Sequence, residues 1–160
     1  MIYLGSDHAG FRLKETIKKY LGQLKEPYQD LGNHHYDPND DYPDFSYQVA
    51  FKVGHNPRTL GILFCGSAQG ACITANKVKG VRAASVKTVA EAILAREHDD
   101  VNIICLAGGG QIQKKFRGLG ISSDIAKKIV NAWLGASFSQ ERRHRRRVNK
   151  IKKIEAKNFC

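Results

Sequence analysis

The stretch TLGILFCGSAQGACITANKVKG, residues 59–80, joins an apolar run to a glycine-containing loop and then to a segment with helical character. The run TLGILFC is short and continuously apolar, which is typical of a buried strand. Gly66 and Gly70 let the loop backbone approach a ligand closely, and the loop amides open onto a helix N-terminus that attracts negative charge. A strand that passes through such a loop into a helix is one unit of a parallel α/β fold.

The same alternation of strand and helix extends in both directions from this stretch. Apolar runs predict the other strands at residues 1–6, 28–32, 81–86 and 101–108. Helical periodicity and cap signals predict helices at residues 10–24, 45–54, 69–80, 88–98 and 122–135, and a basic C-terminal helix at 139–157. Asp44 is expected to cap the second helix, and Thr88 with Glu91 to form a capping box at the fourth. Strands separated by such helices predict a five-stranded parallel sheet with right-handed connections.

Length and composition fit one domain over residues 1–160. No apolar run is long enough to cross a membrane, and the N-terminus MIYLGSDHAGF lacks the basic and apolar regions of a signal peptide, so we expect a cytoplasmic protein. The four cysteines, Cys65, Cys72, Cys105 and Cys160, form no CxxC pair. In a cytoplasmic chain the default is free thiols, and Cys72 and Cys105 are interpreted as packing residues.

The formal net charge of +11 is concentrated near the C-terminus. Residues 141–160 hold nine Lys and Arg and two Glu, which account for +7, so residues 1–140 carry only +4. On a helix, Arg143, Arg146, Arg147 and Lys150 would share one face. That face is either a solvated basic surface or a phosphate clamp, because a guanidinium group binds phosphate through two parallel hydrogen bonds.

Parallel α/β sheets bind ligands beyond the carboxyl ends of their strands, and this rule selects three groups of residues. They are Asp7 and His8 after the first strand, Cys65 to Gly70 after the third, and Gly108 to Gly110 after the fifth. Taken alone, the loop slightly favours a tight turn in which Cys65 is a small core residue. His98, at the end of a predicted helix, is likewise explained by the helix dipole, which favours a cation there.

Six motifs, taken together, resemble one family. They are GSDHAGF (5–11), DDYPDF (40–45), FCGSAQGACITANKVKGVRAA (64–84), AREHDDVNII (95–104), NAWLGASF (131–138) and RRHRRRV (142–148). Their order and spacing are similar to those of the type B ribose-5-phosphate isomerases and the related galactose-6-phosphate isomerase subunits, over nearly the whole chain. The resemblance implies a Rossmann-like α/β/α sandwich and a homodimer, or a tetramer, with active sites built from both subunits.

The resemblance also implies a role for each candidate residue. Cys65 would be the base that moves a proton between C1 and C2 of the sugar, and His98 of the partner subunit would assist opening of the furanose ring. Ser67 and the backbone of its neighbours would hold the enediolate: Gly66, Ala68, Gln69 and Gly70. The other substrate contacts would be Asp7 on the sugar hydroxyls, Tyr42 lining the pocket, and His8, Arg143 and Arg147 on the phosphate.

Isomerisation of this kind is consistent with these residue types. It needs a base beside a carbonyl and hydrogen-bond donors aimed at the oxygen that becomes negative. A helix N-terminus lowers the pKa of a nearby cysteine, so we expect a lowered pKa for Cys65. No metal or cofactor is expected, because proton transfer and hydrogen bonding suffice and His34 and His35 lack matched partners.

Three positions depart from the family pattern. Asp99 replaces an asparagine directly after the ring-opening histidine, Gly109 replaces an arginine that reaches the phosphate, and Ala68 replaces a loop glycine. Asp99 and Gly109 are expected either to weaken substrate binding or to shift substrate preference, and Arg146 is proposed to supply part of the lost charge. The interpretations that remain are a ribose-5-phosphate isomerase of the pentose phosphate pathway and an isomerase of allose or galactose 6-phosphate. A non-catalytic nucleic-acid-binding homologue ranks below both, and no membrane partner is expected.

Overall fold

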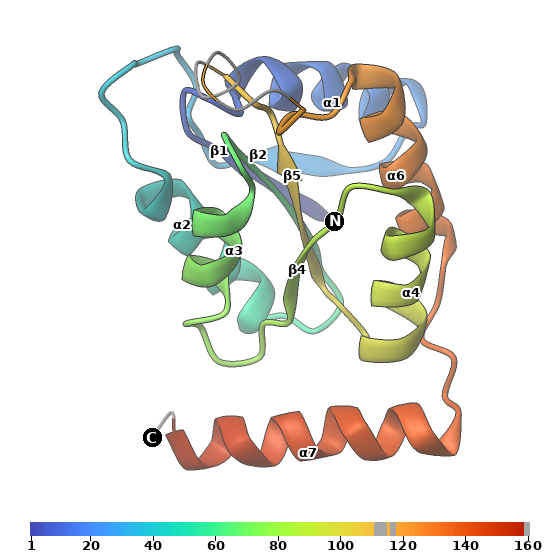
Figure 1. The fold of residues 1–160 in the computed structure, drawn as a ribbon. Coiled ribbons are helices and arrows are strands. Elements are labelled where there is room, and N and C mark those ends of the chain that lie inside the picture. Colours follow the sequence, from blue (N-terminus) through green and yellow to red (C-terminus); the bar gives the residue numbers. More distant parts are fainter. Residues whose placement is uncertain (111–114, 116–117, 159–160) are drawn as a thin grey trace.

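The computed structural model describes residues 1–110, 115 and 118–158, and it has the predicted α/β architecture. Five strands form one sheet: β1 (Ile2–Ser6), β2 (Tyr28–Asp30), β3 (Leu60–Cys65), β4 (Ala83–Ser85) and β5 (Ile103–Ala107). All neighbouring strands are parallel, in the order β2-β1-β3-β5-β4 (Figure 1). The prediction of a five-stranded parallel sheet is therefore confirmed. Cys160 lies outside the described residues.

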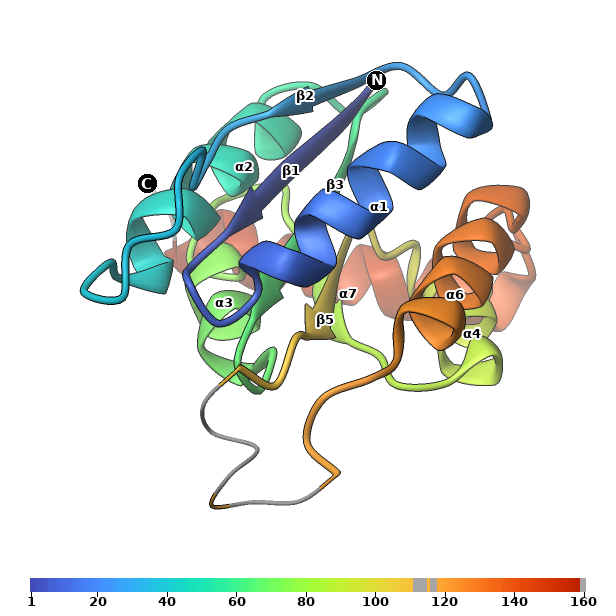
Figure 2. The same ribbon diagram turned by 90° about the horizontal axis from the view of Figure 1, so that it is seen from above.

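Helices cover both faces of the sheet. They are α1 (Phe11–Gln23), α2 (Tyr42–Gly54), α3 (Gln69–Ala75), α4 (Val89–Asp99), α6 (Ser123–Gly135) and α7 (Arg142–Asn158). Helices α1, α4 and α6 lie on one face, and α2 and α3 on the other (Figure 2). Alternate residues of β3 and β5 therefore enter two apolar clusters, with Phe64 in the first and Cys65 and Cys105 in the second. Among the described residues no helix is both long and apolar enough to span a bilayer.

The predicted start of α2 and the predicted end of α3 are wrong, and each has a local cause. Helix α2 begins at Tyr42 instead of after Asp44, because Pro43 is tolerated in a first helical turn and Asp41 supplies the extended N-cap residue. Helix α3 ends at Ala75 instead of near residue 80. The Asn76 side chain accepts the Ala83 amide and donates to the Ala83 carbonyl at 2.9 Å each, which ties the chain to β4 where the helix stops.

A buried ion pair fastens α1 to β2. Lys14 is fully buried, and its Nζ lies 2.8 Å from both carboxylate oxygens of Asp30 and also donates to the Asn33 carbonyl. Lys18 reaches the same carboxylate at 2.7 Å from a more exposed position. Burial acts to raise the pKa of Asp30, but the two lysine contacts outweigh it and lower that pKa. Asp30 is therefore held as a carboxylate at the edge of the sheet.

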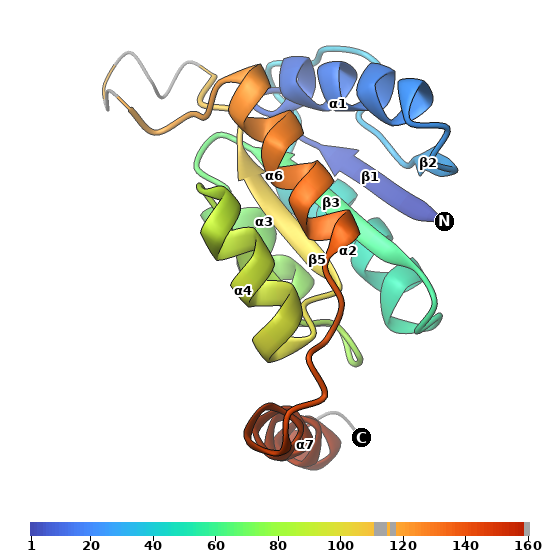
Figure 3. The ribbon, with the colours of Figure 1, turned by 90° about the vertical axis from the view of Figure 1, so that its right-hand side faces the viewer.

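Helix α7 lies outside the two helical layers. It begins at Arg142, not at the predicted residue 139, and runs beneath the body of the molecule next to the end of α4 (Figures 1 and 3). Its buried side chains are His144 and Val148, and Glu155 accepts a hydrogen bond of 2.6 Å from the Gly80 amide. One narrow face of α7 is thus attached to the body.

Candidate active site

The predicted site residues of the N-terminal half converge on one pocket. Strands β1 and β3 are neighbours, so the loops that follow them meet at the carboxyl edge of the sheet. The pocket between these loops has a volume of about 330 Å³. It is lined by Asp7, His8, Ala9, Tyr42, Cys65, Gly66, Ser67 and Gly70.

Cys65 is the last residue of β3 and borders this pocket with only 3% of its surface exposed. The backbone amides of Ser67, Ala68 and Ala71 all act on its sulfur and favour the thiolate. Burial, the largest effect, and the Asp7 carboxylate oppose them, so the pKa of Cys65 is raised. The expected lowering of this pKa is therefore wrong for the protein without substrate, although the expected cluster of amides is there.

The loop after Cys65 contributes its backbone unevenly. Ala68 has φ +66°, a left-handed conformation that glycine adopts more easily, and its methyl group is buried against the second apolar cluster. Gln69 points outward and is exposed. Neither side chain lines the pocket, so any contact of these two residues with a ligand would be through the backbone. Gly70 leaves room for the ring of Tyr42, because a Cβ atom would lie 2.4 Å from that ring and force it to move.

Asp7 and His8 occupy the opposite wall, and each is held by hydrogen bonds. The Asp7 carboxylate accepts the Gly10 amide at 2.9 Å, and its pKa is raised because it is buried. His8 Nδ1 lies 2.7 Å from Asp40, whose carboxylate also accepts from the Asn33 side chain. Burial disfavours the His8 cation, but Asp40 and Asp7 outweigh it and raise the pKa of His8. The pocket wall thus favours a cation at His8, which suits a phosphate group.

Gly109 follows β5 and is hydrogen-bonded to the loop after Cys65 without lining the pocket. Its φ is +78°, and its amide donates to the Gly66 carbonyl at 3.0 Å. An arginine placed here would have to adopt the left-handed conformation that this glycine accommodates. Gly109 therefore departs from the family pattern in two ways: it lacks the arginine side chain, and its backbone has a conformation that disfavours an arginine.

His98 lies at the C-terminus of α4 and stacks on a residue that the sequence did not single out. The rings of His98 and His144 are 4.0 Å apart between centroids and inclined by 28°. His144 is 1% exposed, and its Nδ1 is 2.7 Å from the Ser139 hydroxyl. Burial and the neighbouring His98 lower the pKa of His144. The signal that could have revealed it is the spacing of His144 and Val148, one helical turn apart within an arginine run.

Within one chain, the candidate site residues fall into two groups at opposite edges of the sheet. Helix α4 leads back to the start of β5, so His98 and Asp99 lie at the amino edge, and α7 with Arg143 and Arg147 lies there too (Figure 3). Cys65, Asp7 and His8 lie at the carboxyl edge. A strand of five residues separates these edges by about 17 Å. Within a single chain, the pocket therefore lacks His98, Arg143 and Arg147.

Comparisons with known proteins agree with the motifs. A family model described as Ribose/Galactose Isomerase matches residues 2–151. The chain is 44% identical over 155 residues to the probable ribose-5-phosphate isomerase B of Mycoplasma genitalium, covering 96% of this chain and 95% of that protein. It is 37% identical over 154 residues to ribose-5-phosphate isomerase B of Mycobacterium tuberculosis, covering 96% and 89%.

Solved structures give the same result. A crystal structure of ribose-5-phosphate isomerase B from M. genitalium with bound ribulose-5-phosphate has a TM-score of 0.89 and 41% identity, covering 98% of this chain and 97% of that one. Ribose-5-phosphate isomerase B from Clostridium thermocellum has a TM-score of 0.86 and 38% identity, with coverage of 98% and 97%. On its motifs, its fold and these similarities, the chain belongs to the ribose/galactose isomerase family.

Proposed function

We propose that residues 1–160 form a single ribose-5-phosphate isomerase domain, which interconverts D-ribose 5-phosphate and D-ribulose 5-phosphate in the pentose phosphate pathway. The observation that carries this proposal is the Cys65 thiol at the pocket, with three backbone amides around its sulfur. The M. genitalium relative, which shares this fold, was solved with ribulose-5-phosphate bound.

Cys65 acts as the base in this proposal. In the aldose-to-ketose direction its thiolate takes the proton from C2, and the electron pair moves into the C1 carbonyl to give an enediolate. The C2 hydroxyl then passes its proton to the C1 oxygen, and Cys65 returns its proton to C1 as the C2 carbonyl forms. Ser67 and the loop amides bind the negative oxygen, and Asp7 and Tyr42 position the sugar. The amides around Cys65 reduce the cost of forming the thiolate in a buried site.

The remaining groups come from a second copy of the chain. His98, Arg143 and Arg147 lie at the amino edge of their own sheet, so they complete a pocket only if another subunit presents that edge to it. A two-fold dimer does this twice and forms two shared sites. His98 of the partner subunit opens the furanose ring, and the partner's Arg143 and Arg147 join His8 on the phosphate.

The direct test of the proposed function is a coupled assay of the purified protein in EDTA, with five-carbon and six-carbon aldose phosphates compared. We expect turnover of ribose 5-phosphate to exceed that of allose and galactose 6-phosphates in kcat/KM. The reverse order would assign the six-carbon alternative. No turnover of any of them would reject the enzyme.

Subunit complementation tests the shared site. Cys65→Ala and His98→Asn variants should each be nearly inactive as homodimers. Co-expressed in equal amounts, they should recover about a quarter of the wild-type activity, because half of the dimers then carry one intact site of two. As a control, Cys65→Ala mixed with the double variant Cys65→Ala/His98→Asn should recover nothing. Failure of the first pair to recover activity would contradict a shared site.

A second prediction concerns the charge on His8. Its raised pKa means that the cation is lost only as pH rises through that pKa, so KM should rise over the same pH range. Asp40→Asn removes the main group that raises the pKa of His8, so the increase in KM should begin at lower pH, with kcat changed less. Asp37→Asn, in the same exposed loop, is the matched control. Parallel KM profiles for wild type and Asp40→Asn would exclude this role of Asp40.

A further inference from the structure

Helix α7 carries far more positive charge than the proposed substrate site uses. Its 17 residues contain nine Lys and Arg and one Glu, a formal charge of +8. The single acid, Glu155, is hydrogen-bonded to the Gly80 amide on the body side. Within the described residues the only ion pair of an α7 cation is Arg143 with Glu141. The other cations of α7 are therefore exposed, and none of them pairs with an acidic side chain of residues 1–110, 115 or 118–158.

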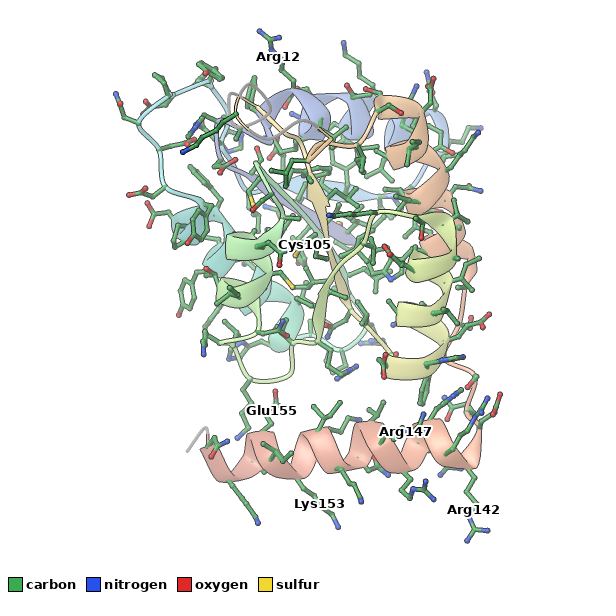
Figure 4. The ribbon with its side chains drawn as sticks, in the orientation of Figure 1. Arg12, Cys105, Arg142, Arg147, Lys153 and Glu155 are labelled. Atoms are coloured by element: carbon green, nitrogen blue, oxygen red, sulfur yellow. The ribbon has the colours of Figure 1, made fainter. Side chains whose placement is uncertain are left out.

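These cations are divided between different sides of the helix. At 3.6 residues per turn, Arg142, Arg146, Lys150, Lys153 and Lys157 fall within about 80° of one another. We call these five residues the outer stripe. All five are exposed, and they lie opposite the face that His144 and Val148 bury against the body. Figure 4 shows Arg142 and Lys153 pointing away from the body, while Glu155 points toward it.

The outer stripe is distinct from the proposed phosphate clamp. Arg143 and Arg147 lie to one side of the buried His144, next to the His98 end of α4, whereas the stripe is centred on the far side. Arg146, suggested by the sequence as an extra substrate ligand, is about 40° from Arg142 and belongs to the stripe. Part of the positive charge of α7 therefore lies on a second side of the helix, centred away from the proposed clamp.

We propose that the outer stripe binds the phosphate backbone of a nucleic acid. The five cations span about 22 Å along the helix axis with no acidic side chain among them, so they complement a linear polyanion. The stripe has no aromatic residue for base stacking, which predicts binding without sequence preference. An acidic membrane fits less well, because an interfacial helix needs an apolar face to insert. Val148 is buried against the body, and the exposed Ile151 and Ile154 line a pocket between α7 and the body, outside the stripe.

The test is fluorescence anisotropy with a labelled 20-nucleotide oligothymidylate, titrated with the full-length protein at several NaCl concentrations. Five phosphate contacts predict a slope of log K against log salt of about −3.5, or about a 100-fold loss of affinity between 50 and 200 mM. Arg142→Gln/Lys153→Gln/Lys157→Gln should reduce the slope to about −1.4, which corresponds to about a sevenfold loss over the same range. Isomerase activity and thermal stability should be unchanged, since none of the three residues belongs to the proposed site.

The matched control is Arg12→Gln/Lys19→Gln/Lys128→Gln, which removes the same three charges from exposed positions on α1 and α6. Figure 4 shows Arg12 at the end of the molecule remote from α7. This variant should keep the wild-type slope. Equal slopes for the two triple variants would overturn the proposal, as would binding to vesicles of phosphatidylcholine and phosphatidylglycerol without binding to the oligonucleotide. Both outcomes are independent of whether the protein turns over ribose 5-phosphate.

Discussion

Replacing Cys65 with alanine is expected to lower kcat by about 10²- to 10⁴-fold, the usual contribution of a positioned general base. The sulfur borders the pocket, and the amides of Ser67, Ala68 and Ala71 surround it. The substitution removes the base and leaves the loop backbone in place, so binding of phosphate should persist. The measurement is kcat in the coupled assay, with KM and the melting temperature determined in parallel.

Cys72→Ala is the matched control, because Cys72 is a half-buried free thiol on α3 that does not line the pocket. It should retain near wild-type kcat. Iodoacetamide should inactivate the wild type, and bound substrate should slow that reaction. Because the pKa of Cys65 is raised, inactivation of the free enzyme should accelerate as pH rises toward that pKa. A Cys65→Ala enzyme with normal kcat would place the base elsewhere.

Replacing Lys14 with methionine should cost about 3–5 kcal/mol of unfolding free energy, the range for breaking a buried ion pair by removing one partner. The Lys14 ammonium is completely buried between Asp30 and the Asn33 carbonyl. Methionine has a similar shape, so most of the loss comes from leaving the Asp30 carboxylate without its buried partner. Urea denaturation at neutral pH gives the free energy directly.

Lys18→Met provides the comparison, since Lys18 contacts the same carboxylate with 23% of its side chain exposed. It should cost less than about 1 kcal/mol. The pH dependence gives a second criterion. In the wild type the pKa of Asp30 is lowered, so its stabilising contribution is present above the unfolded-state pKa and is lost as pH falls through the folded-state pKa.

In Lys14→Met this pH dependence should weaken. Asp30 keeps its contacts with Lys18 and the Gly32 amide but loses the buried ammonium, so its pKa in the folded state rises relative to the wild type and less stability is lost as pH falls. Equal losses of unfolding free energy for the two lysine variants, with the same pH dependence, would show that the buried contact of Lys14 stabilises the fold no more than the exposed contact of Lys18.

Local sequence patterns were sufficient to predict the order of strands and helices along the chain and part of the candidate site. Alternation of apolar runs with helical segments predicted the parallel sheet, and the carboxyl-edge rule brought Asp7, His8 and Cys65 together. The Thr88 capping box is also confirmed, because both of its hydrogen bonds join residues three apart. These features depend on neighbours in the sequence or on the topology of the sheet.

The features that the sequence did not reveal depend on distant partners. His144 is defined by its stacking on His98, and the charge of His8 by Asp40, which is 32 residues away. Nothing in the local sequence marks Lys14 as buried, and its ammonium is accommodated because Asp30 arrives from β2. The pKa of Cys65 was predicted in the wrong direction because burial is a property of the whole fold, while the helix N-terminus is local.

The separation of Cys65 and His98 by the length of the sheet also has a consequence for mass action. If each site needs two chains, specific activity per chain must fall when the enzyme is diluted below the dissociation constant of the dimer. A substrate molecule that contacts both chains binds only the dimer. By thermodynamic linkage, substrate must therefore strengthen dimer formation by the same factor by which dimer formation strengthens substrate binding. The amount of sugar phosphate in the cell would then help to set how much of the enzyme is assembled.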